Sequence, residues 1–136
     1  MRNGNVLVVE DDDAIRRLLI EYLKSHEAVN VDGARDGVEA LHQIATNHYA
    51  VMILDVMMPK MSGIDVLDSL EALTFDPSVK ALQSPLPVLV ITSAEKTILP
   101  DRAITQRCPG SVQRVFRKPF DMKELAACAE RYLQTG

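Results

Sequence analysis

The chain has 136 residues, of which 47% are hydrophobic and 25% are charged, and its formal net charge is −4 at pH 7. This length suits one compact domain, and a mildly acidic surface gives no electrostatic reason to bind nucleic acid or anionic lipid. No apolar run approaches the roughly 18 residues of a membrane helix, and residues 6–9 are too few for the core of an export signal. Cys108 and Cys128 form no CxxC or zinc pattern, so we expect free thiols in a cytoplasmic protein.

The first half of the chain alternates between short apolar runs and apolar residues at helical spacing. Residues 6–9 predict a buried strand, residues 28–31 a weaker second strand, and residues 51–54 a third strand that ends at Asp55. A helix is predicted after each of these strands. The apolar stripes of the three helices are Ile15, Leu18, Leu19, Tyr22 and Leu23, then Val38, Leu41, Ile44 and Ala45, then Ile64, Leu67 and Leu70.

The second half is less regular. Several prolines predict a long connection over residues 74–87, and a fourth strand is predicted at residues 88–91. Residues 101–108 have poor periodicity and predict the weakest of the helices. A fifth strand is predicted at residues 112–116. The last helix is predicted to open at Asp121, to include Leu133, and to leave no room for an output domain within residues 1–136.

Polar side chains follow four of the predicted strands. Alternating strands and helices predict a parallel sheet with helices on both faces, and ligands of such sheets bind beyond the carboxyl ends of the strands. Glu10 and Asp11 follow the first strand, Asp55 the third, Thr92 the fourth and Lys118 the fifth. We therefore expect three carboxylates, a hydroxyl and an ammonium at one edge of the sheet.

Together, these groups could bind a cation and a phosphoryl group, which none of the residues would indicate alone. Carboxylates a few ångströms apart repel one another, and a hard divalent cation such as Mg²⁺, which prefers oxygen ligands, relieves that conflict. Mg²⁺ and a lysine could then neutralise a phosphoryl group, and an aspartate is a known covalent acceptor of phosphate. Taken alone, each residue would more often be a turn or surface residue, and Asp12 and Asp13 are predicted only to cap the first helix.

Four segments carry a specific resemblance. They are residues 6–12 (Val-Leu-Val-Val-Glu-Asp-Asp), 53–63 (Ile-Leu-Asp-Val-Met-Met-Pro-Lys-Met-Ser-Gly), 87–94 (Pro-Val-Leu-Val-Ile-Thr-Ser-Ala) and 117–120 (Arg-Lys-Pro-Phe). In order and spacing they resemble the receiver domain of two-component response regulators, over nearly the whole chain. The resemblance implies an α/β, flavodoxin-like, doubly wound sheet of five parallel strands in the order 2-1-3-4-5, with helices on both faces.

The resemblance also implies roles for individual residues. Asp55 matches the phosphoacceptor, and Mg²⁺ would be held by Glu10, Asp11, Asp55 and the backbone carbonyl of Met57. Thr92 and Lys118 match the residues that bind the phosphoryl group and switch with it. Two further matches concern the backbone: Pro119 would follow a cis peptide bond, and Gly63 would open the third helix.

The implied function is a signalling switch that accepts a phosphoryl group on Asp55 from a histidine kinase or a histidine phosphotransfer protein, and that an unknown downstream protein reads. Such a protein catalyses only its own phosphorylation and dephosphorylation. Two alternatives stay open. One is a receiver-like scaffold that acts without phosphate. The other is a phosphatase with an aspartate nucleophile, which would normally carry a second aspartate where Met57 stands.

The chain departs from the family pattern in its second half. The intervals from Gly63 to Thr92 and from Thr92 to Lys118 are long, which predicts an insertion within residues 74–86. The aromatic switch residue of the family usually lies three positions before the lysine, where this chain has Val115. Either that aromatic is missing, or a shift of one residue lets Phe116 serve as a possible switch aromatic. We favour the interpretation that Phe116 is a core residue.

Overall fold

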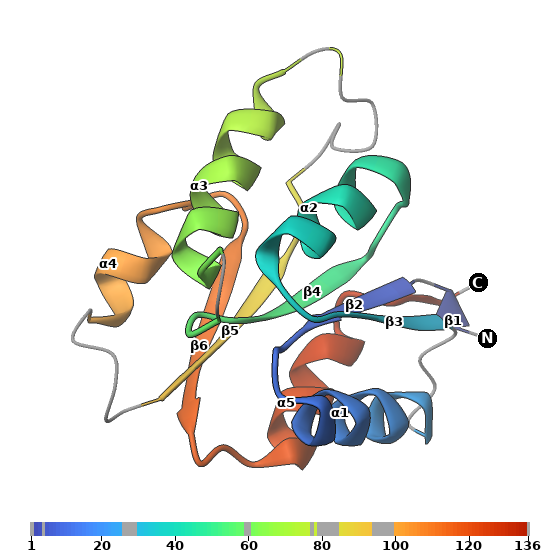
Figure 1. The fold of residues 1–136 in the computed structure, drawn as a ribbon. Helices are drawn as coiled ribbons and strands as arrows, with labels where there is room; N and C mark the ends of the chain where they lie inside the picture. The colour runs from blue at the N-terminus through green and yellow to red at the C-terminus, as the bar shows by residue number, and fades with distance from the viewer. Residues whose placement is uncertain are drawn as a thin grey trace.

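The core of the protein is a sheet of five parallel strands (Figure 1). A computed structural model describes residues 2–3, 5–25, 30–58, 61–76, 78, 85–93 and 100–135. The strands are β2 (Asn5–Val9), β3 (Asn30–Ala34), β4 (Val51–Asp55), β5 (Val88–Ser93) and β6 (Val112–Lys118). Their spatial order is β3-β2-β4-β5-β6. This confirms the predicted order 2-1-3-4-5.

Helices cover both faces of this sheet. They are α1 (Asp13–Ser25), α2 (Gly37–Thr46), α3 (Gly63–Thr74), α4 (Asp101–Thr105) and α5 (Met122–Glu130). Helices α1 and α5 lie together on one face, and α2, α3 and α4 lie on the other (Figure 1). Among the residues that the structure describes, no helix is long and apolar enough to cross a membrane.

A second, very small sheet was not predicted. Strand β1 (Arg2–Asn3) pairs antiparallel with β7 (Gln134–Thr135), so that the two ends of the chain lie side by side (Figure 1). The last helix was predicted to run through Leu133, and this was wrong. Helix α5 ends at Glu130, and the next residues form tight turns in which the amide of Leu133 donates to the carbonyl of Glu130. Leu133 is nevertheless buried.

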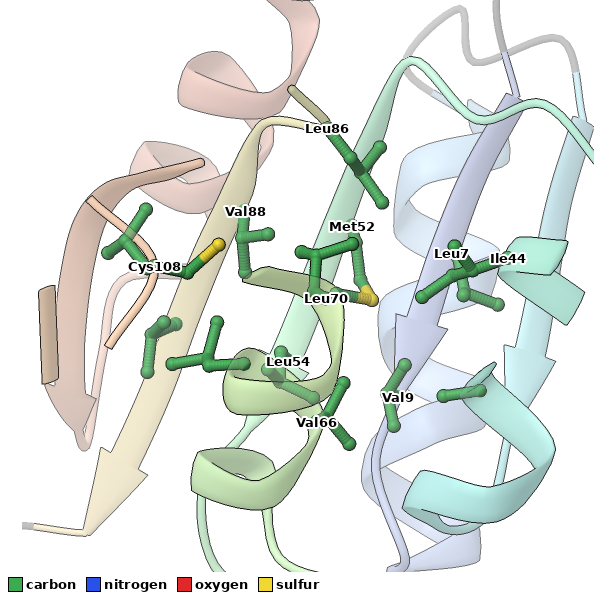
Figure 2. Close-up of a cluster of buried hydrophobic side chains, with 14 of the residues drawn as sticks. Leu7, Val9, Ile44, Met52, Leu54, Val66, Leu70, Leu86, Val88 and Cys108 are labelled. Carbon is green, nitrogen blue, oxygen red and sulfur yellow. The ribbon is translucent and has the colours of Figure 1, made fainter. Parts of the chain in front are cut away.

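The sheet separates two hydrophobic clusters because successive side chains of a strand point to opposite faces. In β2, Leu7 and Val9 belong to the cluster under α2 and α3, whereas Val6 and Val8 belong to the cluster under α1 and α5. Figure 2 shows the first cluster, in which side chains of the strands pack against those of the covering helices. Both faces are therefore apolar, which explains why the strands read as continuous apolar runs. Cys108 and Cys128 are buried free thiols, as expected.

Two other details of the sequence prediction need correction. The second strand was predicted at residues 28–31, of which 28 and 29 lie outside the described residues. Strand β3 continues to Ala34, beyond the predicted end, because it includes Asp32 and Gly33, which have low strand propensity. In the helical stripes, Leu18 and Val38 are each 58% exposed. Neighbouring helical residues lie ~100° apart, so Leu19 occupies the core position and Leu18 points to solvent.

Ala45 is also exposed, which removes it from the predicted stripe of α2. The insertion predicted within residues 74–86 lies mostly outside the described residues. In the part that is described, the chain leaves α3 at Phe75 and returns at residue 85 before β5.

Gly63 allows α3 to start close to the end of β4. A Cβ atom at this position would lie 2.4 Å from the carbonyl oxygen of Asp55 and 2.6 Å from the Cα of Val56. The amide of Gly63 also donates to the carbonyl of Val56 at 2.9 Å. A backbone neighbour cannot move aside as a flexible side chain can, so this close approach of α3 to the end of β4 requires a residue without a side chain.

We predict that Gly63→Ala lowers the free energy of unfolding by about 1–3 kcal/mol, since the added methyl overpacks against backbone. This is opposite to what helix propensity alone predicts for a glycine replaced in a helix. The measurement is urea unfolding. Gly110→Ala is the matched control, because a Cβ there meets only Pro85 at 3.8 Å, and it should change stability by less than about 0.5 kcal/mol. Equal effects of the two variants would contradict the argument.

Candidate functional site

The carboxyl ends of the parallel strands bring the predicted site residues to one edge of the sheet. Glu10 follows β2 directly, and its amide continues the pairing with β3 by donating to the carbonyl of Ala34 at 3.1 Å. Asp55 is the last residue of β4 and pairs with Ile91, so Thr92 lies one residue further along β5 at the same edge. Lys118 is the last residue of β6. Glu10, Asp55 and Thr92 are buried.

Lys118 is the charge partner of two of these carboxylates. Its Nζ lies 3.1 Å from Oε1 of Glu10 and 3.6 Å from Oδ2 of Asp55. Burial alone would lower the pKa of Lys118, but the negative charges of Asp55 and Glu10 outweigh burial and raise that pKa above its ordinary value. The ammonium therefore stays charged throughout the neutral range and joins the two strand ends electrostatically.

The three carboxylates are close enough to bind one cation. Glu10, Asp11 and Asp55 each offer an oxygen, and these oxygens lie within 4.8 Å of one another. Burial raises the pKa of Glu10 to about 7, the hydrogen bond and repulsion from Asp55 add to this rise, and Lys118 opposes it. The pKa of Asp11 is also raised, by partial burial and by Glu10. The set is thus short of positive charge, and its all-oxygen donors fit a hard cation such as Mg²⁺.

The segment after β4 positions Asp55 by hydrogen bonds of its backbone. The amide of Val56 donates to the carbonyl of Ile91 at 3.0 Å, which extends the pairing with β5 beyond the last strand residue. The amide of Met57 donates to Oδ1 of Asp55 at 3.1 Å, so this oxygen is oriented by its own loop while Oδ2 faces Lys118. The role of the Met57 carbonyl as a metal ligand stays a prediction. The peptide bond before Pro119 is cis, as expected.

Asp12 and Asp13, at the start of α1, make different contacts. Asp12 caps the helix, as predicted, because its Oδ1 accepts from the amides of Ala14 at 2.9 Å and Ile15 at 3.1 Å. Asp13 instead forms an ion pair with Arg16 on the next turn of the helix. It therefore does not act as a second cap.

Arg16 is the residue near the site that the sequence reasoning missed. Its Nη1 donates to the carbonyl oxygen of Glu10 at 2.8 Å, and its Nη2 to Asp13. The only signal in the sequence was the spacing of Asp13 and Arg16, which predicts an ordinary helical ion pair. That spacing says nothing about a contact with the end of β2.

Val115 and Phe116 face opposite sides of the sheet, as neighbours in a strand do. Val115 packs against the cluster under α2, α3 and α4, and Phe116 is buried in the cluster under α1 and α5. The guanidinium of Arg114 lies 4.4 Å above the ring of Phe116. Phe116 thus lies in the core, as the favoured interpretation expected, and its use as a switch aromatic stays a prediction. The residue on the side of α4 is the aliphatic Val115.

The amino-acid sequence matches one protein family over most of its length. The model of the response regulator receiver domain matches residues 6–130. Among curated proteins, response regulator MprA of Mycobacterium sp. (strain KMS) is 35% identical over 125 residues, which are 90% of this chain and 47% of the relative. MprA of Mycobacterium avium (strain 104) is 34% identical with the same coverage. The chain thus spans about half the length of the curated relatives that it matches.

Solved structures agree with the fold. The receiver domain of the Francisella response regulator 1452 superposes with a TM-score of 0.77 at 28% identity, over 96% of both chains. The response regulator TrrA of Thermotoga maritima, solved in complex with Mg²⁺-BeF, superposes with a TM-score of 0.74 at 24% identity, over 95% of this chain and 98% of that one. The second likeness shows the fold alone.

The raised pKa of Glu10 predicts a pH dependence of stability when no divalent cation is bound. The folded state holds a proton on Glu10 up to about pH 7, whereas the unfolded chain releases it near the ordinary glutamate pKa of 4.5. The folded state therefore binds more protons in this window, and stability falls as the pH rises from about 4.5 to about 7. The loss is at most about 3–4 kcal/mol, because one pKa unit corresponds to ~1.4 kcal/mol.

Urea unfolding in EDTA at several pH values measures this dependence. Glu10→Gln should flatten the fall between pH 4.5 and 7, and Glu21→Gln, which changes an exposed glutamate of α1, should leave it unchanged. A Glu10→Gln protein with the wild-type pH profile would show that Glu10 does not hold the proton.

Proposed function

This chain belongs to the response regulator receiver domain family, and from that premise we propose that Asp55 accepts a phosphoryl group from a histidine kinase or a histidine phosphotransfer protein. Receiver domains of this family act in phosphorylation-dependent signalling. The observation that carries the assignment to Asp55 is its placement. It is a buried carboxylate at the end of a central strand, 3.6 Å from the ammonium of Lys118 and beside two further carboxylates.

The proposed step is an in-line displacement. A carboxylate oxygen of Asp55 attacks the phosphorus of a phosphohistidine, an O–P bond forms, and the P–N bond breaks with its electron pair left on the imidazole nitrogen. Such a transfer needs positioning and charge stabilisation more than covalent help. The amide of Met57 fixes one oxygen of Asp55, and Lys118 is placed to hold an oxygen of the transferred group.

We further propose Mg²⁺ as the cofactor, held by Glu10, Asp11, Asp55 and the carbonyl of Met57. The cation would neutralise the carboxylates and the incoming phosphoryl oxygens. The support is the chemistry of the donor set: three carboxylate oxygens within 4.8 Å of one another, with the pKa values of Glu10 and Asp11 both raised. TrrA, which shares the fold, was solved with Mg²⁺-BeF.

A switch is favoured over the two alternatives. An aspartate-nucleophile phosphatase needs an acid/base group near the nucleophile, and Met57 offers a thioether on a half-exposed side chain instead. A scaffold that ignores phosphate has no use for two buried carboxylates held by one lysine, since buried charges are costly to maintain. We therefore propose that the chain catalyses only its own phosphorylation and dephosphorylation.

The proposed readout is a protein that recognises the face around α4 and β6. This face adjoins the site, because Thr92 of β5 pairs with Arg117 of β6 and Arg117 forms an ion pair with Asp101, the first residue of α4. Val115 lies on this same face. If the phosphoryl group drew Thr92 and Lys118 inward, the movement would be transmitted to α4 through β6. The phosphoryl group would thereby shift an existing equilibrium between two conformations.

Incubation with acetyl phosphate and Mg²⁺ should add one phosphoryl group to this chain, and Asp55→Asn should abolish the addition. Intact-protein mass spectrometry measures the outcome. Asp68→Asn, which changes an exposed aspartate of α3, is the matched control and should be labelled like the wild type. Labelling that persists in Asp55→Asn would refute the assignment of this residue.

Thr92→Ala should separate binding from switching. Fluoroberyllate with Mg²⁺, a mimic of the phosphoryl group, should shift amide resonances of α4 and β6 in the wild type and in Thr92→Ser, which keeps the hydroxyl. In Thr92→Ala the resonances near Asp55 should still shift while those of α4 should not. Full shifts of α4 in Thr92→Ala would show that the hydroxyl does not carry the signal.

A further inference from the structure

The guanidinium of Arg16 connects α1 to Glu10, the residue that follows β2. Nη1 donates to the carbonyl oxygen of Glu10 at 2.8 Å, and Nη2 donates to the carboxylate of Asp13. We propose that Arg16 is a positioning residue: it fixes the peptide between Glu10 and Asp11, and through it the two acidic side chains that bind the cation. This inference rests on the proposed function, because it concerns the same Mg²⁺ site.

The contact acts on both acidic residues because a peptide unit is planar. The carbonyl of Glu10 and the amide of Asp11 belong to one rigid group, so a hydrogen bond to that oxygen also sets the direction in which Asp11 leaves the strand. The amide of Glu10 is held from the other side by the carbonyl of Ala34 at 3.1 Å. Asp11 itself is exposed, so packing does little to orient it.

The side chain of Arg16 is itself held in place by neighbouring residues. The side chain is only 16% exposed, and Leu19 and Ile20 on the next turn of the helix are buried and half-buried. The stem passes over β3 at Gly33, where a Cβ atom would lie 3.1 Å from Cδ of Arg16. A planar guanidinium can serve both acceptors at once, which a single ammonium does less well.

The electrostatic effect of Arg16 on the site has the opposite sign to its positioning effect. A positive charge near a cation site repels the cation, so removing the charge alone should tighten Mg²⁺ binding. Loss of a group that orients metal ligands typically weakens metal binding by about 10- to 100-fold. The direction of the change therefore tells the two roles apart. A helical ion pair that only stabilised α1 would change Mg²⁺ affinity little.

The test is titration calorimetry of Mg²⁺ into the full chain. Arg16→Met, which removes charge and donors but keeps an unbranched stem, should weaken binding by about 10- to 100-fold. Arg17→Met, the matched control, removes the exposed neighbouring charge, and it should leave the affinity unchanged or slightly tighter. Arg16→Lys retains one donor for the carbonyl and should bind more tightly than Arg16→Met. Arg16→Met that binds as well as Arg17→Met, or Arg16→Lys no better than Arg16→Met, would overturn the proposal.

Two further measurements keep failures distinguishable. If the wild type binds no Mg²⁺, the proposed function fails; if it binds and Arg16→Met is unchanged, only the role of Arg16 fails. In EDTA, the amide resonance of Asp11 should shift in Arg16→Met and stay in place in Arg17→Met, with both variants folded by urea unfolding. An unmoved Asp11 amide in Arg16→Met would also overturn the proposal, independently of any cation.

Discussion

The half-buried ammonium of Lys118, set between the buried carboxylates of Glu10 and Asp55, is the interaction on which the candidate site depends. Its Nζ approaches the two carboxylates to 3.1 and 3.6 Å, and 108 residues separate Lys118 from Glu10 along the chain. Charges buried in this way are tolerated only when they are paired. The pairing is possible because parallel register brings the ends of β2, β4 and β6 to one edge of the sheet.

One lysine does not balance the three carboxylates of this edge, and the pKa of Glu10 is raised by burial first and by the neighbouring Asp55 second. The imbalance favours a cation, and a doubly negative phosphoryl group on Asp55 would in turn need that cation and Lys118 together. Arg16 adds charge near the site but points its donors at backbone and at Asp13 rather than at the acidic cluster. Lys118 therefore neutralises the carboxylates of the site, whereas Arg16 orients the peptide between Glu10 and Asp11.

Much of the fold follows from local patterns, and the misses have physical reasons. The strands at residues 6–9 and 51–54 were predicted because strands buried on both faces read as apolar runs. The prediction ended the second strand at residue 31, whereas β3 continues to Ala34, since an edge strand with Asp32 and Gly33 gives little apolar signal. Leu18 and Leu19 both fit a helical stripe, but only Leu19 is buried when the helix packs on the sheet. Phe116 was favoured as a core residue, and the register of β6 places it on the face of α1 and α5.

The sequence by itself determined the family, the alternation of strands and helices, and which polar residues end the strands, because these depend on residue type and local spacing. Tertiary structure alone decided which oxygens meet Lys118, how far Glu10 is buried, and that Arg16 reaches the carbonyl of Glu10. These contacts join elements whose relative placement is set by packing across the sheet. Every residue has a carbonyl oxygen, so the pattern of side chains in a sequence cannot show which carbonyl accepts the hydrogen bond of Arg16.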